Sequence, residues 1–153
     1  MASYRATTDW RLEAGGDFPK GRYSRGHSIS FGSGHVAPGT ASPHVVGARW
    51  AAAGAVDPEE MLVASINSCH MLSFLHVARE AGFAVSRYRD EAEGVMTPNE
   101  VGDLWVSKVT LRPQVSYAGP EPTAAEADAL HEKAHHICFI ANSVKTEIVV
   151  QPL

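Results

Sequence analysis

The segment that most constrains the fold of this chain is one long helix-forming stretch without formal charge. Residues 61–78 contain no Asp, Glu, Lys or Arg, and apolar residues occupy nearly every face of the helix that they would form. A helix that is apolar all round must be covered on all sides. A chain of 153 residues fits one domain, which offers little surface for that purpose. We therefore expect a sheet on one side of this helix and a partner chain on the other.

Both ends of the helix carry recognisable capping residues. Asp57 stands at the N-cap position, Pro58 at the first helical position and Glu60 at the third, a pattern typical of a helix start. Gly82 provides the C-terminal stop after about Ala81. Serine, asparagine and histidine residues interrupt the apolar run, so we interpret it as a buried core helix and not as a membrane span.

Shorter elements are predicted on either side of this helix. Thr123 opens a capping box for a second helix that ends near His136. Period-two patterns bounded by turn residues predict the strands. They lie at residues 4–12, 28–31, 45–50, 88–96, 105–112 and 146–151. The order strands, helix, strands, helix, strand indicates an α+β fold with antiparallel sheet.

Composition narrows the range of functions. The net charge of -4 gives no basic surface that would indicate nucleic-acid binding. The first residues lack the apolar stretch of a signal peptide, so we expect a cytoplasmic protein. In that compartment cysteines are more often catalytic, redox-sensing or metal-binding than structural.

The chain has two cysteines, and each is associated with one of the two predicted helices. Cys69 falls in the middle of the first helix, and Cys138 follows the end of the second. We expect them to meet in the fold as a redox pair. The alternative for each is a small buried apolar residue, which is how a free cysteine often packs.

Several segments together resemble the OsmC/Ohr family of hydroperoxide-detoxifying proteins. Residues 57–62 (Asp-Pro-Glu-Glu-Met-Leu) precede Cys69, and residues 142–147 (Asn-Ser-Val-Lys-Thr-Glu) follow Cys138. The resemblance covers roughly residues 25–153. It implies a single domain over residues 1–153, in which residues 1–24 form a peripheral N-terminal extension.

The resemblance also implies a function and an assembly. The protein would be a thiol peroxidase that reduces organic hydroperoxides without metal, haem or flavin. It would form an intertwined homodimer, with antiparallel sheets packed around long central helices. A dithiol, of the lipoyl type in some members, would serve as the reductant, and neither nucleic acid nor membrane would be a partner.

Four residues receive roles from the resemblance. Cys69 matches the peroxidatic cysteine and Cys138 the resolving one, while Arg49 and Glu59 match an arginine and the glutamate that steadies it. A guanidinium beside a thiol favours the reactive thiolate. Ten residues of helix (69 − 59) separate Glu59 from Cys69, about 15 Å of rise. Glu59 would therefore act through Arg49, through a helix break, or in the partner's site, and we favour a composite site at the dimer interface.

Alternatives remain for these two residues. First-turn acids such as Glu59 are favoured by the helix dipole without any further role, and Arg49 can be a plain surface residue. The sequence also departs from the family pattern twice, with Phe139 in place of a proline and His70 in place of an apolar or aromatic residue. We expect Trp50, Phe74 and Phe139 to be core residues.

The histidines raise two further alternatives. His131, His135, His136 and Cys138 are close in sequence, and zinc uses such ligands. The spacing lacks any C-x-x-C or H-E-x-x-H signature, so we predict no metal site. The second alternative is functional: a non-catalytic dimeric binding protein for an apolar ligand, in which the cysteines act as a redox switch.

Overall fold

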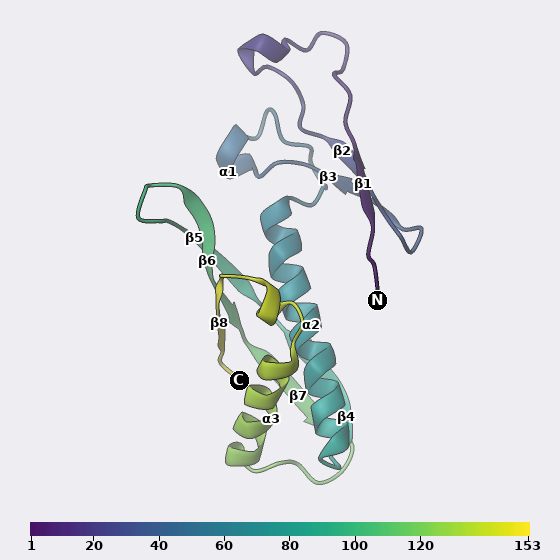
Figure 1. Cartoon of the computed structure of the whole chain (residues 1–153), viewed down its shortest axis with the longest axis vertical. Coiled ribbons are helices and arrows are strands. Elements are labelled where there is room, and N and C mark those ends of the chain that lie inside the picture. The colour runs from purple at the N-terminus through teal and green to yellow at the C-terminus, as the bar shows by residue number, and fades with distance from the viewer. The chain divides into compact units, whose positions relative to one another are not determined.

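The computed structural model describes all 153 residues and divides into two compact units, Met1–Met61 and Leu62–Leu153. The first unit contains a three-stranded antiparallel sheet in the order β1-β2-β3 (Figure 1). Its strands are β1 (Ala6–Asp9), β2 (His27–Phe31) and β3 (Val36–Gly39), and it also holds a short 3-10 helix, η1 (Phe18–Lys20). The predicted extension, residues 1–24, contributes β1 to this sheet.

The strand predicted at residues 45–50 was wrong. A one-turn helix, α1 (Pro43–Val46), stands there instead. The Ser42 side chain accepts a hydrogen bond from the His44 N–H, Pro43 occupies the first turn, and Gly47 ends the helix at φ 79°. These capping residues prevail over the β preference of two adjacent valines. The strand β3 was not predicted, because Pro38 weakens the strand pattern, although proline is tolerated at a sheet edge.

The long helix α2 (Pro58–Glu80) begins and ends as predicted. Asp57 and Glu60 form a reciprocal cap, since the Glu60 N–H donates to Asp57 Oδ1 at 2.8 Å and the Asp57 N–H to Glu60 Oε2 at 3.2 Å. Gly82 adopts φ 86°, a left-handed conformation that glycine accepts without strain. By length and composition α2 is the one helix apolar enough to cross a membrane, a test that the core helix of a soluble protein also passes.

The second unit combines two sheets with the helix α3 (Ala124–Ile137) and the short turn η2 (Ala141–Ser143). The first sheet pairs β4 (Val85–Asp90) with β7 (Pro113–Tyr117), and the second has the order β5-β6-β8. The strands of this second sheet are β5 (Glu93–Pro98), β6 (Leu104–Leu111) and β8 (Glu147–Val150). Every strand pair is antiparallel except β6 with β8, which is parallel, so the prediction of antiparallel sheet was wrong for that pair alone.

The prediction of one strand at residues 88–96 was wrong, because this segment contains the end of β4 and the start of β5, which belong to different sheets. The chain turns between β4 and β5, where Asp90 Oδ1 accepts a hydrogen bond from the Arg112 N–H at 2.7 Å. Arg112 is itself the residue between β6 and β7. The chain therefore passes from one sheet to the other at the same place twice, between β4 and β5 and between β6 and β7. The strict alternation predicted for residues 105–112 is also broken. A register shift at Ser107 leaves Val106 and Val109 both buried although they are three residues apart.

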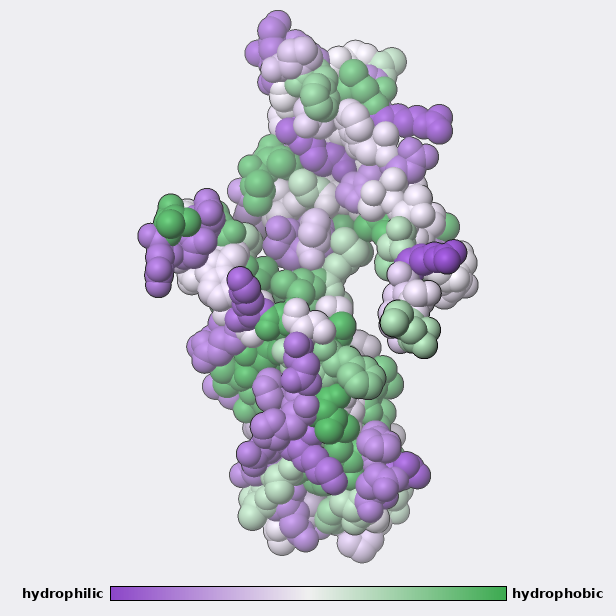
Figure 2. All heavy atoms as spheres, viewed as in Figure 1, coloured by the Kyte–Doolittle hydropathy of each residue, from purple (hydrophilic) through white to green (hydrophobic).

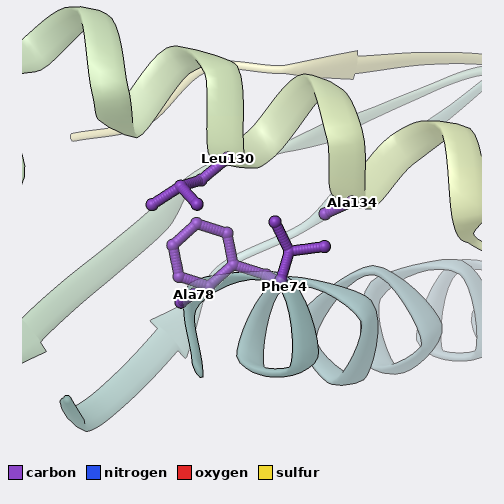
Figure 3. Close-up of a cluster of buried hydrophobic side chains, with 5 residues drawn as sticks. Phe74, Ala78, Leu130 and Ala134 are labelled. Atoms are coloured by element: carbon purple, nitrogen blue, oxygen red, sulfur yellow. The ribbon is translucent and has the colours of Figure 1, made fainter. Parts of the chain in front are cut away.

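Two buried clusters hold the second unit together. In the first, Phe74 and Ala78 of α2 point toward Leu130 and Ala134 of α3 (Figure 3). In the second, Ile66 of α2 packs against the sheet residues Val106, Val109 and Leu111. Gly94 of β5 allows this close approach, because a Cβ there would come within 2.5 Å of Val63. The sheet expected on one side of the helix is confirmed.

The remaining faces of α2 are covered only in part within the chain. Five of its 23 residues are buried, and they form one stripe: Ile66, His70, Phe74, Val77 and Ala78. Leu72, on another face, is 60% exposed. Figure 2 shows apolar surface among the polar side chains on the visible face of the molecule.

The buried stripe supports a stability prediction. Replacing Phe74 by Ala should lower the free energy of unfolding by about 3–5 kcal/mol, because the ring is fully buried and its loss leaves a cavity. Chemical denaturation followed by circular dichroism measures the change. Leu72→Ala is the matched control in the same helix. Its effect should be small for an isolated chain and should grow with protein concentration if a partner covers Leu72. A Phe74→Ala loss below about 1 kcal/mol would contradict the packing described here.

Candidate functional site: a pair of thiols between α2 and η2

The structure brings Cys69 and Cys138 together. Cys69 lies in the middle of α2, and Cys138 is the C-cap residue of α3. The two sulfurs accept hydrogen bonds from successive backbone N–H groups, those of Ile140 and Ala141, and both thiols are free rather than joined in a disulfide. Their meeting was predicted from the sequence, while the chemical role of each stays a prediction.

The turn that follows α3 supplies two backbone donors to this pair. The Ile140 N–H donates to Cys69 Sγ at 3.5 Å, and the Ala141 N–H donates to Cys138 Sγ at 3.4 Å. The turn η2 packs beside α3, as the yellow segment near α2 in Figure 1 shows. Sequence reasoning missed both amides, because a backbone donor leaves no mark in the residue types.

The two thiols have different surroundings. Cys138 is fully buried and Cys69 is half-buried. Burial raises the pKa of the Cys138 thiol above its usual range, and the neighbouring Cys69 side chain raises it further. Its place at the C-terminal end of α3 acts in the same direction, since that end of a helix disfavours an anion. Cys69 is therefore the better placed of the two to react first with a molecule from solution.

Phe139 corrects one expectation. It was predicted to be a core residue, but its side chain is 82% exposed beside the buried Cys138. The α3 helix ends at Ile137 and the chain leaves it in an extended conformation at Cys138, which turns the next side chain outward. Of the other two aromatic residues expected in the core, Phe74 is fully buried and Trp50 is half-buried.

Arg49 and Glu59 belong to the first unit, and their roles toward the thiols stay predictions. The exposed Arg49 places its guanidinium 4.8 Å from the centre of the Trp50 ring and lines a cavity of about 470 Å³. Glu59 is half-buried and forms no ion pair with Arg49, while the neighbouring Glu60 makes the helix cap. Because α2 has no interruption between Pro58 and Glu80, the helix break considered above is absent.

A buried histidine pair lies in the second unit. His70 Nε2 and His131 Nδ1 are 3.2 Å apart, and the ring planes are tilted by 8°. Phe74 stacks on His131 with centroids 4.2 Å apart. Burial lowers the pKa of both imidazoles to about 4, and for His70 the proximity of His131 and His135 lowers it further. Both rings are neutral at pH 7 and join α2 to α3.

The histidine cluster offers no metal-ligand geometry. No group of three or more His, Cys, Asp or Glu side chains is arranged to hold a metal ion. His70 Nδ1 and His135 Nδ1 are buried without a hydrogen-bond partner, and the exposed His136 lies 3.9 Å from Glu132. The sequence contained a signal for the buried pair, because His70 falls on the same stripe of α2 as Ile66 and Phe74.

The structure is thus an α+β fold in which a long helix brings one thiol close to a second. Comparisons with known proteins show which family has this arrangement. A family model described as OsmC-like protein matches residues 51–152. An OsmC-like protein of unknown function from Vibrio cholerae O1 biovar eltor is 40% identical, with 100% of both chains covered and a TM-score of 0.96. The chain therefore belongs to the OsmC/Ohr family. No match was found among curated proteins.

Two more distant structures share the fold. An organic hydroperoxide resistance protein from Elizabethkingia anophelis is 19% identical, covering 99% of this chain and 94% of its own, with a TM-score of 0.70. The organic hydroperoxide resistance protein OhrB of Bacillus subtilis is 16% identical, covering 99% and 98%, with a TM-score of 0.72. At these identities the likeness shows the fold alone.

The histidine pair predicts acid sensitivity. The folded-state pKa of each imidazole, about 4, lies below the ordinary 6.5, so between these values the unfolded chain binds more protons than the folded one. Stability is therefore complete above pH 6.5 and falls as the pH drops toward 4, by about 3 kcal/mol per imidazole. Denaturant unfolding at several pH values measures the loss. A His131→Phe variant should lose less stability over this range than wild type.

His136→Gln is the control for this experiment. His136 is exposed, so its removal should leave the pH dependence unchanged. Equal slopes for wild type and His131→Phe would show that the buried pair does not titrate as described.

Proposed function

We propose that this protein is a cysteine-based peroxidase that reduces organic hydroperoxides. The observation that carries the proposal is the placement of two free thiols, one half-buried and one fully buried, on successive backbone N–H groups of one turn. A thiol peroxidase with a resolving cysteine needs such a pair. Membership of a family that includes organic hydroperoxide resistance proteins supports the same reading.

The first step takes place at Cys69. Its thiolate attacks one oxygen of the hydroperoxide, an S–O bond forms, and the O–O bond breaks. The departing alkoxide takes a proton and leaves as an alcohol, so that the peroxide is reduced by two electrons and Cys69 becomes a sulfenic acid. The half-buried position of Cys69 gives a substrate access to its sulfur.

The second step uses Cys138. Its sulfur attacks the sulfenic sulfur of Cys69, an S–S bond forms and water leaves. Both sulfurs accept from neighbouring N–H groups of one turn, so the disulfide would form between two side chains that the fold already brings together. A dithiol of the lipoyl type would then reduce the disulfide by thiol–disulfide exchange, returning two thiols and leaving as its own cyclic disulfide.

Arg49 and Glu59 complete the proposed site. A guanidinium near Cys69 would favour the thiolate and donate hydrogen bonds to the peroxide oxygens, and Glu59 would hold the guanidinium. In the isolated chain these two residues form no ion pair with each other. A homodimer in the cytoplasm fits the proposal, because a second copy would cover the faces of α2 that this chain leaves open.

Peroxide-dependent loss of thiols tests the function. Reduced protein mixed with one equivalent of cumene hydroperoxide should lose both thiols and two mass units, because one disulfide forms, and should react faster than with hydrogen peroxide. Free-thiol assay and intact mass spectrometry measure this. Cys69→Ser should consume peroxide no faster than the uncatalysed reaction.

The Cys138→Ser variant separates the two steps. It should still react once at Cys69 and gain one oxygen, because attack does not need the second thiol. Wild-type thiols that stay reduced over minutes would contradict the peroxidase proposal and favour the dimeric binding protein for an apolar ligand. That protein would keep its ligand affinity in Cys69→Ser.

A further inference from the structure

The turn after α3 presents N–H groups to both sulfurs. Ile140 N donates to Cys69 Sγ and Ala141 N to Cys138 Sγ, and the Ile140 N–H is also near enough to Cys138 to favour its thiolate. The C-terminal end of α3 would otherwise direct its carbonyl groups, the negative end of the helix dipole, toward this region. The turn instead directs N–H groups at the sulfurs. The partial charge that faces the thiols is therefore positive and not negative.

Asn142 fixes this turn. Its side-chain Nδ2 donates to the carbonyls of His136 at 2.9 Å and Cys138 at 3.0 Å, and its backbone N–H also donates to the Cys138 carbonyl at 3.1 Å. Both side-chain partners are acceptors only, so the amide must present its NH₂ group to them. Asn142 thus satisfies carbonyls that the end of α3 leaves without a helical partner.

We propose that Asn142 is a positioning residue for the thiol pair: by locking residues 138–142 it holds the Ile140 N–H against the Cys69 sulfur, where that N–H stabilises the thiolate, and keeps Cys138 within reach of the oxidised Cys69. Asn142 contacts neither sulfur itself. The second half of this proposal rests on the proposed peroxidase function, while the first half concerns the thiol alone and can be tested without any peroxide.

Asn142→Asp and Asn142→Ala are the informative variants. Aspartate keeps the shape but sets carboxylate oxygens against two carbonyl oxygens and adds a negative charge near the thiols. Alanine removes the two hydrogen bonds without adding charge. The control is Thr123→Ala, which removes the capping box at the opposite end of α3 at a similar cost in stability, about 1 kcal/mol, and leaves the turn intact.

The first readout is the pH dependence of alkylation. Iodoacetamide labels the reduced full-length protein, and peptide mapping assigns the label to Cys69 or Cys138. Loss of one hydrogen bond to the thiolate should raise the midpoint for Cys69 by about half a pH unit or more in Asn142→Ala, and further in Asn142→Asp. Midpoints that match wild type, or an equal rise in Thr123→Ala, would overturn the proposal.

The second readout is the lifetime of the oxidised Cys69. After one equivalent of cumene hydroperoxide, dimedone should trap several-fold more Cys69 sulfenic acid in the Asn142 variants than in wild type, because displacing a reacting group by even 1 Å slows a reaction markedly. Equal trapping would overturn the second half. If wild type does not react with hydroperoxide at all, the proposed function fails, yet a shifted alkylation midpoint still supports the role of Asn142 at the Ile140 N–H.

Discussion

The packing of α3 against one stripe of α2 determines where both thiols lie. Phe74 and Ala78 of α2 interlock with Leu130 and Ala134 of α3 (Figure 3), and the His70–His131 pair joins the same two helices. Moving along α2 from Phe74 toward its N-terminus by about a turn and a half reaches Cys69, and α3 ends at the same level with Cys138. The apolar contact thus sets the register, and the thiols meet because the helices are held there.

Polarity at the thiols follows from how α3 ends. A helix that simply stopped at Cys138 would surround the sulfurs with free carbonyl groups and oppose the thiolate. The turn through Ile140 and Ala141 presents N–H groups instead, and Asn142 occupies the free carbonyls. Burial still disfavours the anion at Cys138. The two cysteines therefore differ because of exposure, although each receives a similar backbone donor.

Local rules predicted the parts of this fold that depend on local interactions. The caps at Asp57 and Thr123 and the stop at Gly82 gave α2 and α3 to within one or two residues. The sheets were harder to predict, because the bend at Asp90 depends on a hydrogen bond to Arg112, 22 residues away. The bulge at Ser107 likewise depends on the partner strand. The parallel pairing of β8 with β6 follows from the path of the whole chain and has no sequence signature.

In the site, too, some features could be predicted from the local sequence and others depend on the fold of the chain. Residue types and order were enough to place two cysteines on a helix and at a helix end, and to expect that they meet. The donors at the sulfurs are main-chain groups, and any residue except proline supplies one. The family pattern usually has proline after the second cysteine, so Phe139 changes the first residue of the turn that carries these donors. The turn here is held by the side chain of Asn142, and a rigid ring at position 139 is not needed to form it. The Phe139 ring, exposed to solvent, therefore takes no part in holding the turn.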